Sequence, residues 1–227
     1  MISTKNKLVC VILAGGKGSR LDKKGKFDQV FNKIPLLEHV FNKVKKQSDL
    51  IVVNFNKKET KSNIEIESIY DTYQDDIGPL AGIHSAIKYS NEKFGEVGMV
   101  CTVPVDTPFL PSDLIDRLYQ NIIKHSSDIV VAKSGTRKHP TIAIWKNSLL
   151  IKLEEYINND IRKIDSFTKD MQVSYESWKI EGIDPFFNIN NYDDLKIAEN
   201  MIKKKKKLRS WRNGIRATLR LLWRKLF

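Results

Sequence analysis

Several features that mark particular protein classes are missing from this sequence. Its 227 residues include only two cysteines, Cys10 and Cys101, and neither belongs to a CxxC or Cys/His pattern. A disulfide-stapled fold and a zinc site are therefore not expected, and two thiols within apolar runs suit a reducing compartment. Long hydrophobic runs are absent too, because no apolar stretch approaches the roughly 20 residues that span a bilayer. The first apolar run, 8–13, is short for a signal sequence, so we expect a cytoplasmic protein.

Acidic residues are missing from the end of the chain. Residues 201–227 include eleven Lys or Arg and no Asp or Glu, whereas the first 200 residues include 28 basic and 27 acidic residues. The net charge of +12 therefore belongs almost entirely to the final segment. A nearly neutral body gives no reason to expect specific nucleic-acid recognition. We expect one domain over 1–200 and a basic C-terminal extension over 201–227.

The body has ordinary globular composition, with 41% hydrophobic residues in the whole chain, and short apolar runs alternate in it with helical patterns. Strands are expected over 8–13, 50–53, 97–105, 128–132 and 141–145, and helices over 35–46, 80–90, 111–124, 148–158 and 192–201. Several strands are continuously apolar, as in sheets covered on both faces. This alternation predicts an α/β fold with a doubly wound, mostly parallel sheet.

A glycine-rich turn follows the first apolar run, in the sequence Ala14-Gly-Gly-Lys-Gly-Ser-Arg20. Three glycines in four positions let the backbone approach a ligand closely, and Lys17 and Arg20 add positive charge where an anion would lie. The turn lacks the GxxxxGK(S/T) pattern of a P-loop, and Leu21 stands where the Rossmann fingerprint has its third glycine. It predicts either a nucleotide site of a third kind or a plain connection after the strand.

Asp106 ends another largely apolar run, 99–105. A carboxylate at the carboxyl end of a buried parallel strand faces the crevice where α/β folds bind ligands. Carboxylate oxygens are also preferred by Mg²⁺, which usually shares them with substrate phosphates. The alternative is that Asp106 stabilises the Asp-Thr-Pro turn or caps the following helix.

Together these segments resemble a known family. The turn Leu13-Ala-Gly-Gly-Lys-Gly-Ser-Arg-Leu21 is similar to the LAGGxxxR opening of nucleotidyltransferases. Six later segments follow in order: 52–54 (VVN), 69–71 (IYD), 78–82 (GPLAG), 103–111 (VPVDTPFLP), 139–141 (HPT) and 184–190 (DPFFNIN). In this order they resemble the molybdenum cofactor guanylyltransferases, the MobA family, over about residues 8–200. The resemblance implies a Rossmann-like nucleotidyltransferase domain.

The resemblance implies a GTP site at the strand ends. Its members are the backbone of the first turn and polar side chains further on: Leu13, Ala14, Gly15, Lys26, Asn54, Asp71 and Asp106. The implied catalytic residues are Arg20, Lys26 and Asp106, with Asp106 binding Mg²⁺. Lys26 is chosen by its distance from Pro35, although Gly25 stands where the family has an acidic residue. For Asn54 and Asp71 the alternative is ordinary turn chemistry.

A second implied site binds Mo-molybdopterin, and its members are Gly82, His139, Asn188 and Asn190. His139 could equally be structural, and Arg162 and Lys163 would either bind the pterin phosphate or remain solvated. The implied reaction transfers GMP from GTP to the terminal phosphate of Mo-molybdopterin and releases pyrophosphate. Two alternatives stay open: cytidylyl transfer to the same cofactor, and a catalytically inactive nucleotide-binding module tethered by its basic tail.

The C-terminal extension departs from the family pattern. Its apolar residues step by three or four, with arginines on the flank, which predicts a basic amphipathic helix: Leu208, Trp211, Ile215, Leu219, Leu222 and Leu226. It could lie on an anionic membrane surface, dock on a molybdoenzyme or its chaperone, or form a disordered polybasic end. We expect a monomer.

Overall fold

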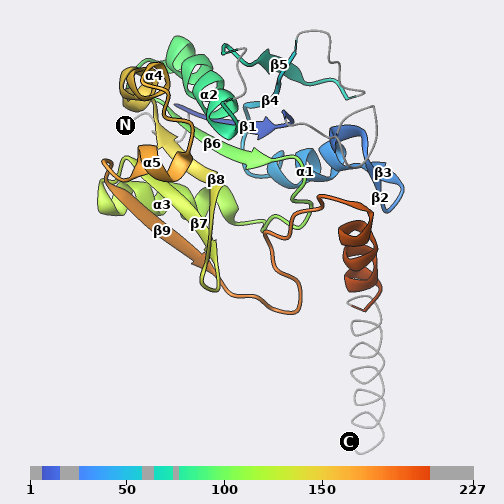
Figure 1. Ribbon diagram of the computed structural model, residues 1–227. Coiled ribbons are helices and arrows are strands. Elements are labelled where there is room, and N and C mark those ends of the chain that lie inside the picture. Colours follow the sequence, from blue (N-terminus) through green and yellow to red (C-terminus); the bar gives the residue numbers. More distant parts are fainter. Residues whose placement is uncertain (1–6, 16–25, 58–63, 74–76, 205–227) are drawn as a thin grey trace, which may run out of the picture.

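The computed structural model describes residues 7–15, 26–57, 64–73 and 77–204 (Figure 1). A seven-stranded sheet with the order β5-β4-β1-β6-β8-β7-β9 forms its centre. The strands of this sheet are β1 (Leu8–Leu13), β4 (Ile51–Phe55), β5 (Glu67–Tyr70), β6 (Met99–Pro104), β7 (Ile129–Ser134), β8 (Arg137–Lys146) and β9 (Val173–Trp178). A separate hairpin consists of β2 (Val30–Phe31) and β3 (Ile34–Pro35).

The sheet is mostly parallel, as the sequence predicts. β1 pairs in parallel with both β4 and β6, and β4 pairs in parallel with β5. β8 is antiparallel to both β6 and β7, whereas β9 is parallel to β7. The reversal was not predicted. It arises because only Gly135 and Thr136 separate β7 from β8, and so short a loop can join only antiparallel strands.

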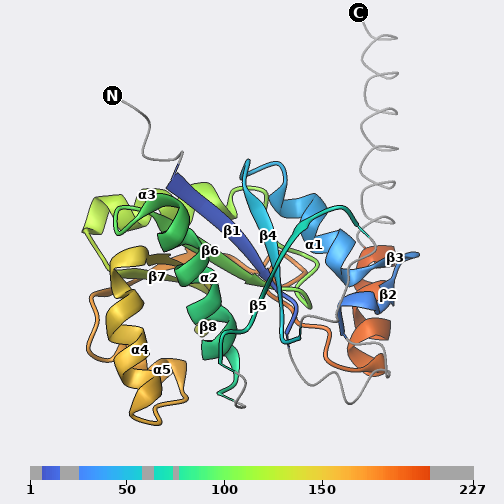
Figure 2. The ribbon, with the colours of Figure 1, turned by 90° about the horizontal axis from the view of Figure 1, so that it is seen from above.

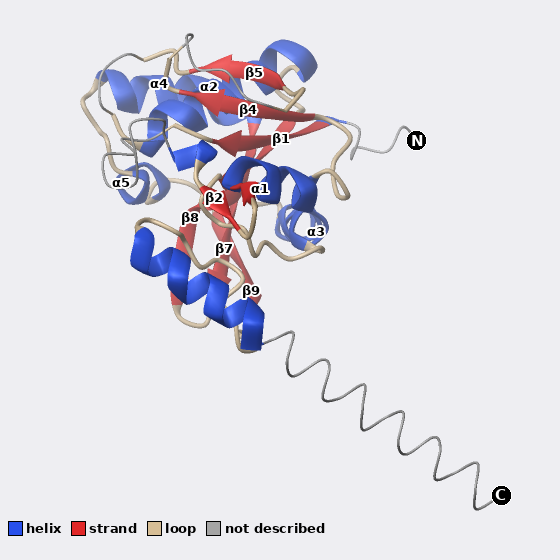
Figure 3. Ribbon diagram, turned by 90° about the vertical axis from the view of Figure 1, so that its right-hand side faces the viewer, coloured by secondary structure: helices blue, strands red, loops and turns tan. Residues whose placement is uncertain are grey.

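Helices cover both faces of the sheet (Figures 2 and 3). One face carries α1 (Leu36–Val44) and α3 (Leu114–His125), and the other carries α2 (Pro79–Phe94), α4 (Leu150–Asn158) and α5 (Ile164–Thr168). Along β1, Cys10 and Ile12 pack toward the first face, and Val9 and Val11 toward the second. Because both faces are buried, the run has to be apolar at every position.

The elements with a strong apolar pattern are those that the sequence predicts. All five expected strands and all five expected helices are present, with ends shifted by a few residues. Elements that the apolar pattern does not predict include β5, β9 and α5. β5 and β9 lie at the two edges of the sheet and have many partly exposed positions, so their sequences, ESIY and VSYESW, carry polar residues that hide the strand pattern.

The two cysteines face each other across adjacent strands. Cys10 on β1 is in register with Cys101 on β6, and both are fully buried and free. The neighbouring Cys101 sulfur and burial raise the pKa of Cys10 well above its usual value. Both thiols therefore act as small apolar core groups.

A last described helix, 192–204, packs beside the β2–β3 hairpin (Figures 1 and 2). Its Ala198 shares a small apolar cluster with Phe31, Leu36 and Ile189. The helix passes residue 200 without a break, and residues 205–227, with the predicted amphipathic stripe, lie outside the described residues. Among the described residues, none of the helices has both the length and the apolar character to cross a membrane.

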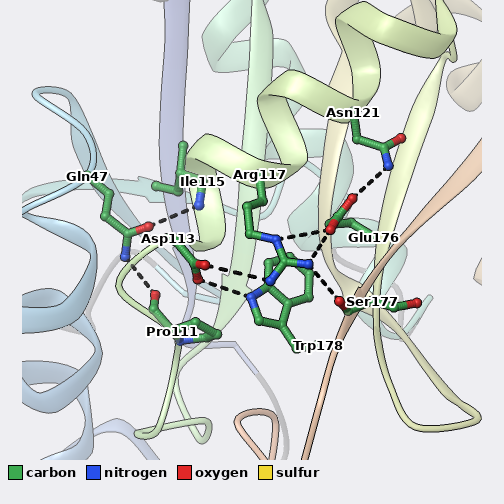
Figure 4. A network of polar contacts seen from close by, with 9 residues as sticks. All are labelled: Gln47, Pro111, Asp113, Ile115, Arg117, Asn121, Glu176, Ser177 and Trp178. Atoms are coloured by element: carbon green, nitrogen blue, oxygen red, sulfur yellow. Dashed lines mark hydrogen bonds and ion pairs between the residues drawn. The ribbon is translucent and has the colours of Figure 1, made fainter.

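Edge strand β9 is fastened to α3 by a polar network (Figure 4). The Arg117 guanidinium lies 4.3 Å from the ring centre of Trp178, forms an ion pair with Glu176, and donates to the Ser177 carbonyl oxygen at 2.7 Å. The Trp178 indole nitrogen donates to Asp113 Oδ1 at 3.1 Å. Stacking and hydrogen bonding thus fix the end of β9 next to α3.

Candidate active site

The fold brings the ends of β1, β4, β5 and β6 together at one edge of the sheet. Leu13, the last residue of β1, is in register with Asn54 on β4 and Pro104 on β6. The Ala14 amide donates to the Asn54 carbonyl oxygen at 2.9 Å, and the Asp71 amide donates to the Phe55 carbonyl oxygen at 3.0 Å. Neighbouring strands lie about 5 Å apart, so the predicted strand-end residues form a continuous row.

Two polar groups in this row have no hydrogen-bond partner among the described residues. Asn54 is 1% exposed, and its Nδ2 amide is buried without a partner, as is Asp71 Oδ1. Burial raises the pKa of Asp71, and the nearby Asn54 amide opposes this shift without completing a hydrogen bond of normal geometry. Buried polar groups are normally paired, so these two atoms are candidates for contact with a bound ligand.

Two glycines let the backbone close around this row. A Cβ on Gly82 would lie 2.7 Å from Asn54 Oδ1 and 3.1 Å from Leu13 Cδ2, so the first turns of α2 can approach only without a side chain there. A Cβ on Gly15 would lie 2.0 Å from Asn56 Oδ1. Gly82 was predicted to contact the second substrate, and the structure places it directly against the Asn54 side chain.

Asp106 follows β6 and is 8% exposed. Thr107 Oγ1 donates to Asp106 Oδ1 at 3.3 Å, and the Asp106 carbonyl oxygen accepts the Ile189 amide at 2.9 Å. The alternative role as a helix cap is not observed, since α3 begins at Leu114 with Asp113 at the cap position. The carboxylate is therefore positioned at the strand end, as expected for a group that meets a ligand.

The segment 184–190 crosses next to Asp106. Asp184 Oδ1 accepts the Phe186 amide at 2.9 Å, and its carbonyl oxygen accepts the Phe187 amide at 3.1 Å. The predicted substrate residue Asn188 approaches Thr107, with 3.5 Å between Asn188 Oδ1 and Thr107 Oγ1. The predicted second-substrate segment and the predicted metal ligand are therefore neighbours.

Asn190 lies where helix 192–204 begins. Its amide donates to Asp194 Oδ2 at 2.8 Å, and the Asp194 amide donates to Asn191 Oδ1 at 2.9 Å. These two contacts resemble a capping box, which explains why the helix starts directly after the DPFFNIN sequence. The cap fixes the backbone of Asn190, while its side chain is exposed.

His139 lies within β8 rather than before the strand, where the sequence suggests it. It is 5% exposed, and its Nε2 atom is 2.8 Å from Ser134 Oγ. Burial lowers its pKa, and the positive charge of Arg137 lowers it further, while Asp184 acts in the opposite direction. A neutral, buried imidazole is better suited to holding neighbouring residues in position than to binding a phosphate group through a positive charge.

The side chains of the remaining predicted residues are either outside the described part of the chain or exposed on its surface. Arg20 and Lys17 lie outside the described residues, and of Lys26 the structure describes only the backbone, at the start of the short 3₁₀ turn η2 (Lys26–Asp28). Arg162 is exposed and forms an ion pair with Asp160 at 2.6 Å, which offsets its charge locally. Lys163 is exposed and precedes α5.

Sequence reasoning missed two residues next to the site, Thr107 and Ser134, and gave Asp184 no role of its own. Thr107 follows Asp106 and is fully buried. Its hydroxyl lies near the Asn188 side chain and so connects the end of β6 with the segment 184–190. Ser134 ends β7, and its hydroxyl reaches Asp184, 50 residues further along the chain. Asp184 was visible as the first residue of the DPFFNIN segment, but nothing local marks Ser134.

A mostly parallel sheet with polar side chains at adjoining strand ends defines an α/β fold of the Rossmann-like class that binds its ligand at this edge. Residues 10–173 match the family of MobA-like NTP transferase domains, and the chain belongs to this family.

Relatives of known name agree with this assignment. A molybdenum cofactor guanylyltransferase of Nitrobacter hamburgensis is 34% identical over 193 residues, which cover 84% of this chain and 92% of the relative. One of Vibrio parahaemolyticus is 31% identical over 185 residues, covering 82% and 91%. The crystal structure of molybdopterin-guanine dinucleotide biosynthesis protein A from Archaeoglobus fulgidus superposes with a TM-score of 0.71 at 28% identity, covering 87% of this chain and 99% of that one.

Proposed function

We propose that the protein transfers GMP from GTP to the terminal phosphate of Mo-molybdopterin, forming Mo-molybdopterin guanine dinucleotide and pyrophosphate. The structural observation that carries the proposal is the open donor and acceptor of Asn54 and Asp71, in the same row of strand ends as Asp106. A nucleotide bound along this row supplies hydrogen-bond partners to the first two residues and phosphate oxygens near the third. The choice of guanine rests on the named relatives.

The proposed reaction is a direct displacement. An oxygen of the acceptor phosphate forms a bond to the α-phosphorus of GTP, and the bond from that phosphorus to the pyrophosphate group breaks. Since a phosphate monoester is already an anionic nucleophile, no strong general base is needed. The chain has to hold two anions together and neutralise them. We assign this work to the turn at Gly15, Lys17, Arg20 and Lys26.

The proposed metal ligand is Asp106. Among the described residues, no group of three or more His, Cys, Asp or Glu side chains could hold a metal alone. A single nearly buried carboxylate fits Mg²⁺, which commonly takes one or two protein carboxylates together with substrate phosphates and water. When bound, the ion would neutralise the phosphates and orient them. Asp106 would fix its position relative to β6.

The test is pyrophosphate release from each nucleoside triphosphate in the presence of Mo-molybdopterin and Mg²⁺. We expect release with GTP and little with CTP, ATP or UTP. The Asp106→Ala variant should lose at least about 100-fold in rate, because it removes the charge that positions the metal. Its melting temperature should fall by no more than a few degrees, since the backbone hydrogen bond from Ile189 to Asp106 is kept and only the contact from Thr107 to the carboxylate is known to be lost.

Three outcomes would change the proposal. A preference for CTP would move the protein to the cytidylyl relatives. Stabilisation of the fold by GTP without pyrophosphate release would indicate an inactive nucleotide-binding module. Full activity of folded Asp106→Ala would refute the metal assignment. The cytoplasmic location, the monomeric state and a role of 201–227 in binding a membrane, a molybdoenzyme or a chaperone stay predictions from the sequence.

A further inference from the structure

The segment 184–190 is anchored to the sheet at two separated points. At its far end, the Ile189 amide donates to the carbonyl oxygen of Asp106 at 2.9 Å, next to the contact of Asn188 with Thr107. At its near end, Asp184 Oδ2 accepts the hydroxyl of Ser134 at 3.0 Å. The first anchor ties the segment to β6, and the second ties it to β7. Asn188 lies between these two anchors, so its position depends on Asp184 as well as on Ile189.

The second anchor is a chain of three side chains. Ser134 Oγ lies between Asp184 Oδ2, at 3.0 Å, and His139 Nε2, at 2.8 Å. Ser134 and His139 are nearly fully buried, with 2% and 5% exposure. The same carboxylate accepts the Phe186 amide through Oδ1 at 2.9 Å. Asp184 thus joins the first turn of its own segment to the β7–β8 hairpin.

The directions of these hydrogen bonds follow from counting protons. An ionised carboxylate can only accept, so the single proton of the Ser134 hydroxyl points to Asp184. The hydroxyl oxygen must then accept a proton from His139, which requires the proton of the neutral ring to be on Nε2. The Nδ1 atom of His139 is left with a lone pair. The chain of three therefore has one orientation, from His139 through Ser134 to Asp184.

Aromatic packing holds the segment in the same place. The ring of Phe186 is fully buried, 4.9 Å from the His139 ring centre and 5.3 Å from that of Trp178. Trp178 is itself held by Arg117 and Asp113. Packing restricts the position of Phe186. The direction of the backbone that leads to Asn188 is set by directional hydrogen bonds at both ends of the segment, at Asp184 and at Ile189.

We propose that Ser134, His139 and Asp184 are positioning residues, which hold 184–190 against the end of β6 so that Asn188 meets the acceptor substrate beside Asp106. This inference rests on the proposed guanylyl transfer and adds the residues that determine acceptor affinity. None of the three needs to touch GTP, whose proposed residues Asn54 and Asp71 lie on β4 and directly after β5.

The first experiment removes the central hydroxyl of the His139–Ser134–Asp184 hydrogen-bond series with the Ser134→Ala variant. We expect molybdopterin affinity, followed by pterin fluorescence, to fall about tenfold, which corresponds to the loss of one charge-assisted hydrogen bond. Affinity for GTP should stay within about twofold. Hydrogen exchange at the Phe186, Phe187 and Ile189 amides should become about tenfold faster, because their segment opens more often.

Two matched variants separate positioning from loss of stability. Ser90 is another fully buried serine, whose hydroxyl donates to the Met99 carbonyl oxygen at 3.1 Å, away from this segment. Ser90→Ala should lower the melting temperature without changing molybdopterin affinity or exchange at 186–189. Ser134→Thr keeps the hydroxyl and should restore both properties.

A spectroscopic experiment tests the orientation. In the wild type, imidazole ¹⁵N shifts should place the His139 proton on Nε2. In Asp184→Asn, Oδ1 can still accept the Phe186 amide, but the new Nδ2 group donates to Ser134. The Ser134 proton then has to turn to His139 Nε2, and the imidazole proton should move to Nδ1.

The proposal is overturned if Ser134→Ala leaves exchange at 186–189 unchanged, if it weakens GTP as much as molybdopterin, or if Ser90→Ala has the same effect on molybdopterin. It is also overturned if the wild-type protein does not bind molybdopterin, or if its His139 proton is on Nδ1. These measurements follow ligand binding, hydrogen exchange and imidazole spectra, and none of them requires catalysis. A wild-type protein that transfers no nucleotide would therefore refute the proposed function alone, and these measurements would still decide the positioning role.

Discussion

In the part of the chain that the structure describes, the two halves of the sheet differ in where buried polar atoms without hydrogen-bond partners occur. In the half made of β5, β4, β1 and β6, Asn54 Nδ2 and Asp71 Oδ1 are buried without partners. In the half made of β8, β7 and β9, Ser134, His139 and Glu176 are all hydrogen-bonded. Among the described residues, none of the buried polar atoms without a partner lies on these three strands.

The difference indicates that the first half of the sheet binds the proposed nucleotide and that the second half stabilises the fold. Each buried polar group without a partner costs about 1–3 kcal/mol, and such groups persist where a ligand completes them. A fully bonded network, in contrast, stabilises one arrangement of the chain. We therefore expect substitutions in the first half to change ligand binding more than stability, and those in the second half to change stability more than nucleotide binding.

The largest expected effect comes from Arg117→Ala in the second half. The variant loses the stacking on Trp178 and leaves the partly buried Glu176 without its cation. We expect the free energy of unfolding to fall by about 2 kcal/mol, measured by urea denaturation. Affinity for GTP should not change.

Arg117→Lys serves as the control for this prediction. It keeps the charge but lacks the planar fork that bonds Glu176 and stacks on the ring, so it should recover only a minor part of the loss. A marked loss of GTP affinity in Arg117→Ala, with stability preserved, would contradict the division between the halves.

An intermediate effect is expected from Gly82→Ala in the first half. The added methyl group would lie 2.7 Å from Asn54 Oδ1, so the amide has to move away from its place beside Asp71. We expect GTP affinity, measured by calorimetry, to fall about tenfold, equivalent to one hydrogen bond. The free energy of unfolding should fall by about 1 kcal/mol, because crowding against the buried Asn54 and Leu13 side chains outweighs the better helix propensity of alanine.

A double-mutant cycle checks the cause. If the methyl group acts by displacing Asn54, then Gly82→Ala should add almost nothing to an Asn54→Ala background. Additive losses would mean that the helix, and not the amide, transmits the effect.

The smallest expected effect is a gain in stability from Asp71→Asn. Because burial raises the pKa of Asp71, the folded protein disfavours the carboxylate. Its contribution to stability is favourable below the unfolded pKa of about 3.9 and is lost as pH rises through the folded value. At neutral pH the neutral amide should therefore raise the melting temperature by no more than a few degrees, and it should weaken GTP binding.

A pH series of melting temperatures tests this sign. The advantage of Asp71→Asn over the wild type should shrink as the pH falls through the raised folded pKa of Asp71 toward its unfolded pKa of about 3.9, and it should be absent at lower pH, where the carboxyl group is uncharged in both states. An advantage that does not depend on pH would exclude the buried charge as its cause.

Much of the fold and of the candidate site follows from local sequence. The run that ends at Leu13 is apolar at every position, which predicts a strand buried on both faces. Asn54, Asp71 and Asp106 lie at the end of such a run or directly after a strand. Parallel strands bring their carboxyl ends to one edge, so a row of site residues could be expected. Their ligands could not be derived from this geometry alone.

The edge strands and the second half of the site could not be predicted in this way. The sequence of β9 has so many polar residues that it resembles a loop. Its position as a strand is stabilised by the packing of Trp178 on Arg117 and Phe186. The reversal of β8 depends on a two-residue connection, which no apolar pattern reports.

The α/β order, the glycine-rich turn and the polar residues at strand ends can be inferred from local sequence, because they depend on neighbours within a few positions. Three features required the folded structure: the contact of Ser134 with Asp184, the close packing of Gly82 against Asn54, and the burial of His139 within a strand. Such contacts join residues up to 50 positions apart, and packing and proton count select them after the strands have been placed.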